Sequence, residues 1–223
     1  MASYTYTSSD LAVATQFANR RQHDSSHYAK RGNVPEKVWA DCVNGALAEI
    51  AAYKALSALF ENATVDPPDF EYYAQRDKNW DPDLKVRFQK LGEEEEVAVK
   101  THVKSFLAGR FGNRIKESFM FQKNSGMHAD RDIAQIQING NALDLFVPVV
   151  NRVQAYEDHL IPKVDATGIA DCCTVYGPFS MQDIVTQKMW KPPKIERLRK
   201  TKQVVYLHEI FKKLSCVESI EIH

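Results

Sequence analysis

Two acidic residues and one lysine stand where their side chains could do chemistry. In a helix, the residues three, four and seven positions from Glu49 are all small or apolar, and none of them is a Lys or Arg. A buried carboxylate without a partner is costly, so this setting indicates a bound metal, a partner from elsewhere in the fold, or a raised pKa. The alternative is that Glu49 lies at the margin of its helix and reaches solvent.

Asp83 and Lys100 lie in two segments in which apolar and polar residues alternate. Asp83 follows Pro82 at the start of the first segment, and the period of two places it on the same face as Lys85 and Arg87. Lys100 lies among alternating valines, where a lysine either extends outward to solvent or serves a negative centre. An exposed strand lysine is the ordinary alternative.

The elements that must position these residues follow from the spacing of apolar residues. Residues 35–60 have helical spacing behind Pro35, which suits the first turn of a helix. Residues 84–88 and 97–103 alternate as two half-buried strands do, with a turn at 91–93. Weaker patterns predict a helix over 9–21, a covering loop over 62–79, strands over 118–122, 132–138 and 142–150 with a hairpin turn at 139–141, a short helix near 181–188 and an amphipathic segment over 203–214. The expected fold class is α/β (α+β), a central mixed β-sheet flanked by helices.

The order of these features resembles the core of the PD-(D/E)XK nuclease superfamily. A helix with an inward Glu is followed by a proline-aspartate at a strand start, a hairpin, and a strand ending in a lysine. The matching segments span roughly residues 40–105, about a third of the chain, and are Asn44-Gly45-Ala46-Leu47-Ala48-Glu49, Pro82-Asp83-Leu84 and Val97-Ala98-Val99-Lys100-Thr101. The resemblance implies a restriction-endonuclease-like core and metal-dependent hydrolysis of a phosphodiester bond.

The resemblance also implies a role for each matching residue. Asp83 would be the principal metal ligand, and Glu49 would reach the ion directly or through water. Lys100 would steady the attacking water or the developing charge. Hard carboxylate oxygens suit Mg²⁺, for which Mn²⁺ is the expected substitute.

Ala98 departs from the family pattern, which has Asp or Glu two residues before the lysine. Three explanations are open. Ala98 is an inactivating substitution introduced for structural study, or the acid has moved and Glu49 or Glu96 compensates, or the domain binds DNA without cutting it. We favour the first two over the third. Glu96 ends a run of acids at a turn, which is usually a solvated tip.

Basic residues gather in two segments although the chain is neutral overall, with 29 Lys plus Arg and 29 Asp plus Glu. Residues 100–123 and 188–202 each mix basic with aromatic residues, among them Phe106, Phe119 and Trp190. Such mixtures suit phosphate contact and base stacking, although a solvated basic loop is commoner. We predict that both segments line a DNA cleft, with contacts from Lys104, Arg110, Arg114, Lys191, Lys194, Arg197, Arg199 and Lys200.

The remaining features set the class of protein. The length fits a single domain over 1–223, with 35–150 as the αβ core and 180–223 as a basic C-terminal extension. Four cysteines without paired spacing fit a reducing, intracellular setting, and the cytoplasm is the expected location. The sequence shows neither a signal peptide nor a membrane-spanning apolar run, so no membrane partner is expected.

The leading functional hypothesis is a Mg²⁺-dependent DNA endonuclease acting on duplex rather than single-stranded DNA. The first alternative is a non-catalytic DNA-binding or interaction protein on a nuclease-like scaffold, and the second is an α/β protein whose acids and lysines are only surface features. Exonuclease action and an RNA substrate stay open, because the motif indicates only phosphodiester chemistry. Cutting both strands of a duplex would favour a homodimer with two-fold symmetry.

Overall fold

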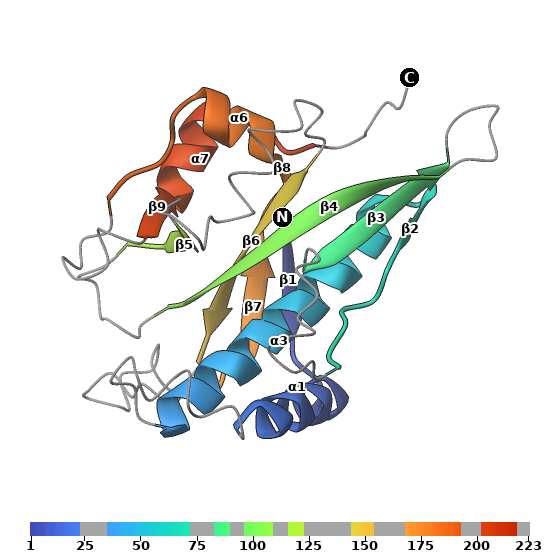
Figure 1. The fold of residues 1–223 in the computed structure, drawn as a ribbon, viewed down its shortest axis with the longest axis vertical. Helices are drawn as coiled ribbons and strands as arrows, with labels where there is room; N and C mark the ends of the chain where they lie inside the picture. The colour runs from blue at the N-terminus through green and yellow to red at the C-terminus, as the bar shows by residue number, and fades with distance from the viewer. Residues whose placement is uncertain are drawn as a thin grey trace, which may run out of the picture.

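The computed structural model describes residues 1–22, 35–71, 83–89, 96–108, 116–122, 144–153, 168–192 and 202–217. Helices and strands are labelled as in Figure 1. The helices are α1 (Ser8–Gln22), α3 (Pro35–Leu59), α6 (Met181–Thr186) and α7 (Leu207–Lys213). The strands are β1 (Ala2–Thr5), β2 (Ala63–Val65), β3 (Leu84–Gln89), β4 (Glu96–Leu107), β5 (Ser118–Gln122), β6 (Leu145–Arg152), β7 (Cys172–Val175), β8 (Phe179–Ser180) and β9 (Lys202–Tyr206).

A seven-stranded sheet forms the centre of the molecule. Its strands run in the order β1-β7-β6-β4-β3-β2, and β8 pairs with β6. β4 and β6 are parallel, whereas the other pairs in this sheet are antiparallel. The protein is therefore an α+β structure with a mixed sheet, and this part of the expected fold class is confirmed.

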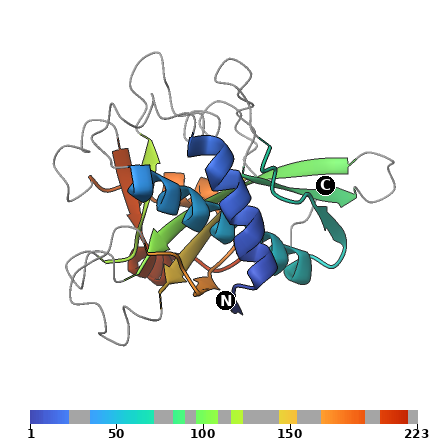
Figure 2. The ribbon, with the colours of Figure 1, turned by 90° about the horizontal axis from the view of Figure 1, so that it is seen from below.

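Helix α3 covers one face of this sheet and carries Glu49. Small side chains on its inner side, such as Ala48, Ala51 and Ala52, pack against Val99 of β4 and Val147 of β6. Alanine favours the helix and lets its backbone approach the strands. Figure 1 shows α3 running alongside β4, and Figure 2 shows α1 lying across α3 on the outside. A smaller apolar cluster that includes Ala14 and Leu47 joins the two helices.

The opposite face of the sheet is covered by a second layer, made of the β5–β9 pair, α6 and α7. Successive residues of a strand point to opposite faces. Val147 and Val149 of β6 accordingly pack on the α3 side, whereas Phe146 and Val150 pack with Phe121 and the rest of the second cluster. The described parts of the predicted C-terminal extension, 180–192 and 202–217, contribute to this cluster Met181, Ile184, Met189, Val205, Leu207 and Ile210.

Most of the periodic segments form the expected elements. The helix predicted over 35–60 is α3, the two alternating segments are β3 and β4, and residues 118–122 are β5. β6 (Leu145–Arg152) overlaps the strand predicted over 142–150 and extends two residues beyond it, and the helix expected near 181–188 is the shorter α6.

Other sequence interpretations need correction. The loop predicted over 62–79 contains strand β2, because residues 63–65 pair with β3. The amphipathic segment over 203–214 is divided between β9 and α7. The strand predicted over 132–138 and its turn at 139–141 lie outside the described residues. Within the part of the chain that the structure describes, none of the helices has the length and apolar character needed to cross a membrane.

Candidate active site

Asp83 lies at the start of β3 and binds the backbone of the neighbouring strand. The last paired residues at this end of the hairpin are Leu84 and Thr101. Beyond them the N–H of Val103 has no β3 backbone partner, and it donates instead to the Asp83 carboxylate over 2.8 Å, from nitrogen to Oδ2. This hydrogen bond holds the Asp83 carboxylate against β4.

Lys104 is the lysine that reaches this carboxylate. Its Nζ lies 3.6 Å from Asp83 Oδ2 and 5.6 Å from the centre of the Phe121 ring. The side chain is 24% exposed, so its charge is partly shielded from water. The β3–β4 register instead places Lys100, the lysine singled out from the sequence, opposite Lys85. Lys104 therefore occupies the position expected of Lys100, four residues farther along the strand.

Glu49 of α3 interacts electrostatically with the same two residues, Asp83 and Lys104. Burial and the negative charge of Asp83 raise the pKa of the Glu49 carboxyl well above its ordinary value, and the charges of Lys104 and Arg21 oppose the rise only in part. The sequence correctly showed no cationic neighbour on its own helix. The positive charges that act on Glu49 come from β4 and α1, so Glu49, Asp83 and Lys104 form one electrostatic group from three separate elements.

Ala98 lies elsewhere on the hairpin. It is exposed and paired with Arg87, whose guanidinium binds Asp66 through two nitrogens at 2.8 Å and lies 4.0 Å from Glu96. If the β3–β4 register is extended by one residue, His102 lies level with Asp83. Position 98 is four positions from His102 along the strand, which corresponds to about 13 Å. An acid at position 98 would face Arg87 and not Asp83. Glu96 is still farther along the strand.

Two further residues, which the sequence did not indicate as a pair, meet between β4 and β6, at the edge of β4 away from β3. His102 of β4 is buried, and its Nε2 lies 3.3 Å from Oδ2 of Asp144, which directly precedes β6. The segment His102-Val103-Lys104 repeats the spacing of Ala98-Val99-Lys100, and this repeat was the available signal. His102 thus stands two residues before the lysine that contacts Asp83.

The predicted DNA-contacting residues are described only in part. Arg110, Arg114, Lys194, Arg197, Arg199 and Lys200 lie outside the described residues. Lys191 is exposed, and its backbone pairs with Val204 of β9. Since β9 also pairs with β5, the described parts of the two basic segments lie side by side.

The aromatic residues of these segments are less available than the sequence suggested. Phe119 is completely buried, and Trp190 is half-buried with its ring 5.0 Å from that of Phe121. Phe106 packs partly buried against the same apolar cluster. Phe119 therefore cannot stack on a base, and Trp190 and Phe106 serve mainly to hold the second layer on the sheet.

The two converging carboxylates suit a hard divalent cation. Magnesium is usually held by one or two protein carboxylates and keeps several of its waters. Glu49 and Asp83 match this donor set, and a bound cation would offset both the burial of the Glu49 carboxylate and the Asp83 charge, which together raise the Glu49 pKa. Among the described residues, no three His, Cys, Asp or Glu side chains gather closely enough to form a larger metal-binding group.

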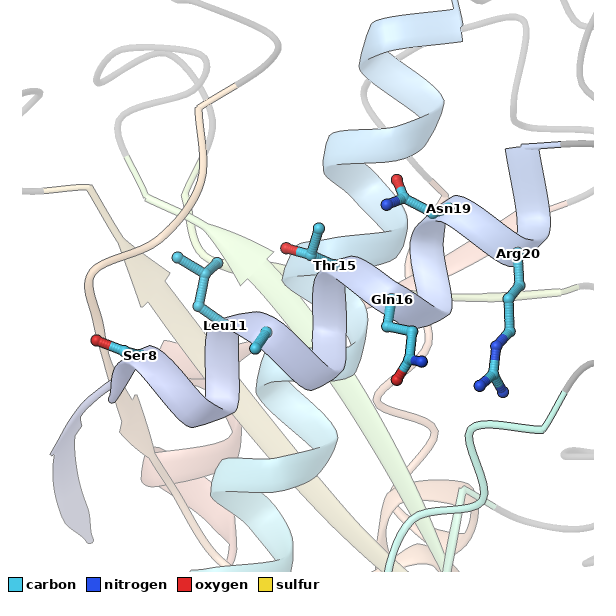
Figure 3. Close-up of a pocket in the computed structure, with 7 residues that line it drawn as sticks. Ser8, Leu11, Thr15, Gln16, Asn19 and Arg20 are labelled. Atoms are coloured by element: carbon cyan, nitrogen blue, oxygen red, sulfur yellow. The ribbon is translucent and has the colours of Figure 1, made fainter.

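A hollow on the outer side of α1 lies apart from these residues. Its described lining comes from one side of that helix (Figure 3) and consists of Ser8, Leu11, Ala12, Thr15, Gln16, Asn19 and Arg20. Arg20 is the single charged side chain in that described lining. The hollow therefore offers no carboxylate or lysine that could take part in the chemistry of the Glu49–Asp83–Lys104 group.

Comparisons with known proteins add no family to this picture. A scan against protein-family models found no match, and a search of curated proteins also found none. Functional interpretation therefore depends on the sequence motif and on the geometry described above.

Proposed function

We propose that this chain is a Mg²⁺-dependent DNA endonuclease built on a restriction-endonuclease-like core. The observation that carries the proposal is the convergence of Glu49, Asp83 and Lys104 at one end of the β3–β4 hairpin. These residues come from a helix, a strand start and the next strand, in that order along the chain. The sequence resemblance implies the same order of acid, aspartate and lysine.

In this proposal Glu49 and Asp83 hold the metal, and Lys104 faces the phosphate. A bound Mg²⁺ would make a water molecule more acidic and neutralise charge on the phosphate. The Val103 N–H fixes the Asp83 carboxylate before metal arrives, which reduces the reorganisation needed for binding. Lys104 would favour the charge that develops on the phosphate oxygens.

The register favours His102-Val103-Lys104 over Ala98-Val99-Lys100 as the segment that corresponds to the acid-x-lysine pattern of the family. Asp83 contacts Val103 and Lys104, whereas Ala98 is paired with Arg87. On this alignment the position of the second acid is occupied by His102. Ala98 then needs no explanation as an inactivating substitution.

DNA is the proposed substrate because the described parts of the two basic segments meet in the layer that contacts Lys104. The β5–β9 pairing brings Lys191 and Lys116 into the same layer, and Phe121 of β5 lies beneath the Lys104 amine. Phosphate contacts of this kind give binding that weakens as salt rises. A second copy of the chain would supply the cut in the other strand of a duplex.

The decisive experiment compares two lysines on the same strand. Cleavage of duplex DNA is measured with Mg²⁺ for the unaltered chain, Lys104→Met and Lys100→Met. We expect Lys104→Met to lower kcat on the order of 100-fold, since it removes a charge-stabilising group, and Lys100→Met to change it by no more than about threefold. An equal loss in both variants would contradict the assignment of Lys104. Absence of Mg²⁺-dependent cleavage in the unaltered chain would refute the nuclease proposal.

A non-catalytic DNA-binding protein on the same scaffold is the second candidate. It is favoured by the histidine at the position where the family has an acid, and by the lack of a three-residue metal-binding group among the described residues. Protection of a defined DNA site by the chain in Mg²⁺, without any cleavage, would support this candidate.

A further inference from the structure

The contact between His102 and Asp144 lies in a part of the sheet where packing alone does not require polar residues. The side chains are only 4% and 16% exposed. The residue of β6 opposite His102 is the apolar Phe146, which packs in the second apolar cluster. Buried polar groups usually stabilise less than well-packed apolar ones, so a pair kept at such a position calls for another reason.

The geometry of the pair connects two neighbouring strands. β4 and β6 run parallel, with Thr101 opposite Leu145, so Asp144 lies at the start of β6 beside this part of β4. The His102 Nε2 lies 3.3 Å from Asp144 Oδ2, and in the tautomer that carries its hydrogen on Nε2 the ring donates to this oxygen. This contact fixes the His102 ring toward β6.

The residues on each side of this contact belong to the proposed site and to the second layer. Val103 directly follows His102 and donates its N–H to Asp83, and Lys104 comes next. On the other side, the main-chain oxygen of Asp144 accepts from the N–H of Met181, the first residue of α6, over 2.9 Å. A continuous series of contacts therefore joins α6, Asp144 and His102 to the segment of β4 that holds Asp83.

We propose that Asp144 is a positioning residue for the reaction. Through His102 it holds the Val103 N–H and the Lys104 amine in place against Asp83. The inference rests on the proposed function, because Asp83 and Lys104 take part in the reaction only if the chain is a nuclease. Asp144 itself touches neither substrate nor metal in this scheme.

The test compares Asp144→Ala with Asp144→Asn, which keeps an oxygen that can accept from Nε2–H. We expect Asp144→Ala to lower kcat by about 10–100-fold, the effect typical of groups that orient a catalytic residue, with KM for DNA within about twofold. Asp144→Asn should recover most of the activity. Asp183→Ala, which changes an exposed acid of α6, is the matched control and should leave kcat unchanged.

A second measurement does not depend on catalysis. Without DNA or metal, hydrogen exchange of the Val103 amide should become at least about tenfold faster in Asp144→Ala than in the unaltered chain, because its contact with Asp83 is held less firmly. Faster exchange in a chain that never cleaves DNA would uphold the positioning role and refute the nuclease function. Unchanged exchange, or a kcat loss equal in the Asn and Ala variants, would overturn the proposal.

Discussion

Helix α3 carries two polar residues, five positions apart, that lie in opposite kinds of surroundings. Asn44 is buried, its amide donates to the Gly168 carbonyl, and its side-chain oxygen accepts from the Ala170 N–H, both over 2.9 Å. Its main-chain carbonyl accepts from Asn151, which in turn accepts from the Tyr6 hydroxyl. Glu49 is instead buried within the electrostatic reach of a second carboxylate, Asp83, and burial together with that charge raises its pKa.

The difference indicates what each polar group contributes. A fully hydrogen-bonded neutral network fixes the position of α3 on β6 and the segment before β7, and it has no polar group to offer a ligand. Two carboxylates close together oppose folding slightly but can bind a cation. The Asn44 network therefore serves stability, whereas the Glu49 group is suited to binding.

The largest change in the free energy of unfolding should come from removing Asn44, the centre of the neutral hydrogen-bond network. Asn44→Ala leaves the Ala170 N–H and the Gly168 carbonyl without partners, which should lower the free energy of unfolding by about 2–4 kcal/mol. Urea unfolding measures this change. Asn19→Ala, which removes an exposed hydrogen bond to the Trp39 indole, should cost less than about 1 kcal/mol. An equal decrease in the free energy of unfolding in the two variants would contradict the stabilising role of the buried network.

Replacing Glu49 should have the opposite effect from replacing Asn44 and, at pH values above the ordinary carboxyl pKa, should increase the free energy of unfolding. Because the folded-state pKa of Glu49 is raised, the fold favours its protonated form, and stability falls as pH rises from the ordinary carboxyl pKa through the raised value. Glu49→Gln carries no charge at any pH and avoids this loss. The unperturbed carboxyl pKa is about 4.5. In EDTA, as pH rises from that value toward neutral, the free energy of unfolding of the Gln variant should therefore increase relative to that of the unaltered chain.

The response of stability to Mg²⁺ gives a second comparison of the unaltered chain with Glu49→Gln. The unaltered chain should be stabilised by Mg²⁺ at neutral pH, whereas Glu49→Gln should gain less, because binding of a ligand to the folded state shifts the unfolding equilibrium. Parallel stability curves for the two proteins across pH, with equal responses to Mg²⁺, would contradict the assignment of Glu49.

A smaller effect is expected where the backbone itself is strained. Lys188 follows α6 with a φ of 50°, in the left-handed region that favours glycine. Its N–H donates to Val185 and that of Met189 to Ile184, which closes the helix end. Lys188→Gly should raise the free energy of unfolding by up to about 1 kcal/mol. Lys188→Ala keeps the strain and is the control, and both variants should reduce the salt dependence of DNA binding. Equal stability of the Gly and Ala variants would contradict this account.

The smallest effect is expected at position 98. Ala98→Glu adds an acid opposite Arg87, among exposed charges, so stability should change by less than about 1 kcal/mol and cleavage by less than about twofold. Of the three explanations left open by the sequence, only an inactivating substitution at position 98 implies that this change restores activity. A tenfold rise in the rate of cleavage would show that Lys100 is the lysine of the site and would refute the assignment of Lys104.

The sequence predicted the elements with strong periodicity and the residues at their ends. α3 and the β3–β4 hairpin have clear spacing, so Glu49 and Asp83 were singled out from the residues that flank them. Lys100 and Lys104 share one face of one strand, and the spacing cannot distinguish them. That choice depends on the contacts of Asp83, because the extended register places it level with His102, midway between the two lysines, and its carboxylate contacts Val103 and Lys104.

Contacts between distant segments left weaker signals in the sequence. His102 and Asp144 meet only because β4 and β6 are parallel neighbours, and no local pattern reports such pairing. The short strands β1, β7 and β8 were missed for a related reason, since a few residues carry too little periodicity to be recognised.

The pairing of β1 with β7 has a consequence for how the protein is made. Residues 2–5 align with residues 172–175, so the first strand must wait for most of the chain to be synthesised before its partner exists. Contacts between residues so far apart in sequence slow folding, and the waiting strand is an exposed edge in the meantime. A nascent chain halted before residue 172 would leave β1 unpaired and available to a chaperone or to another chain.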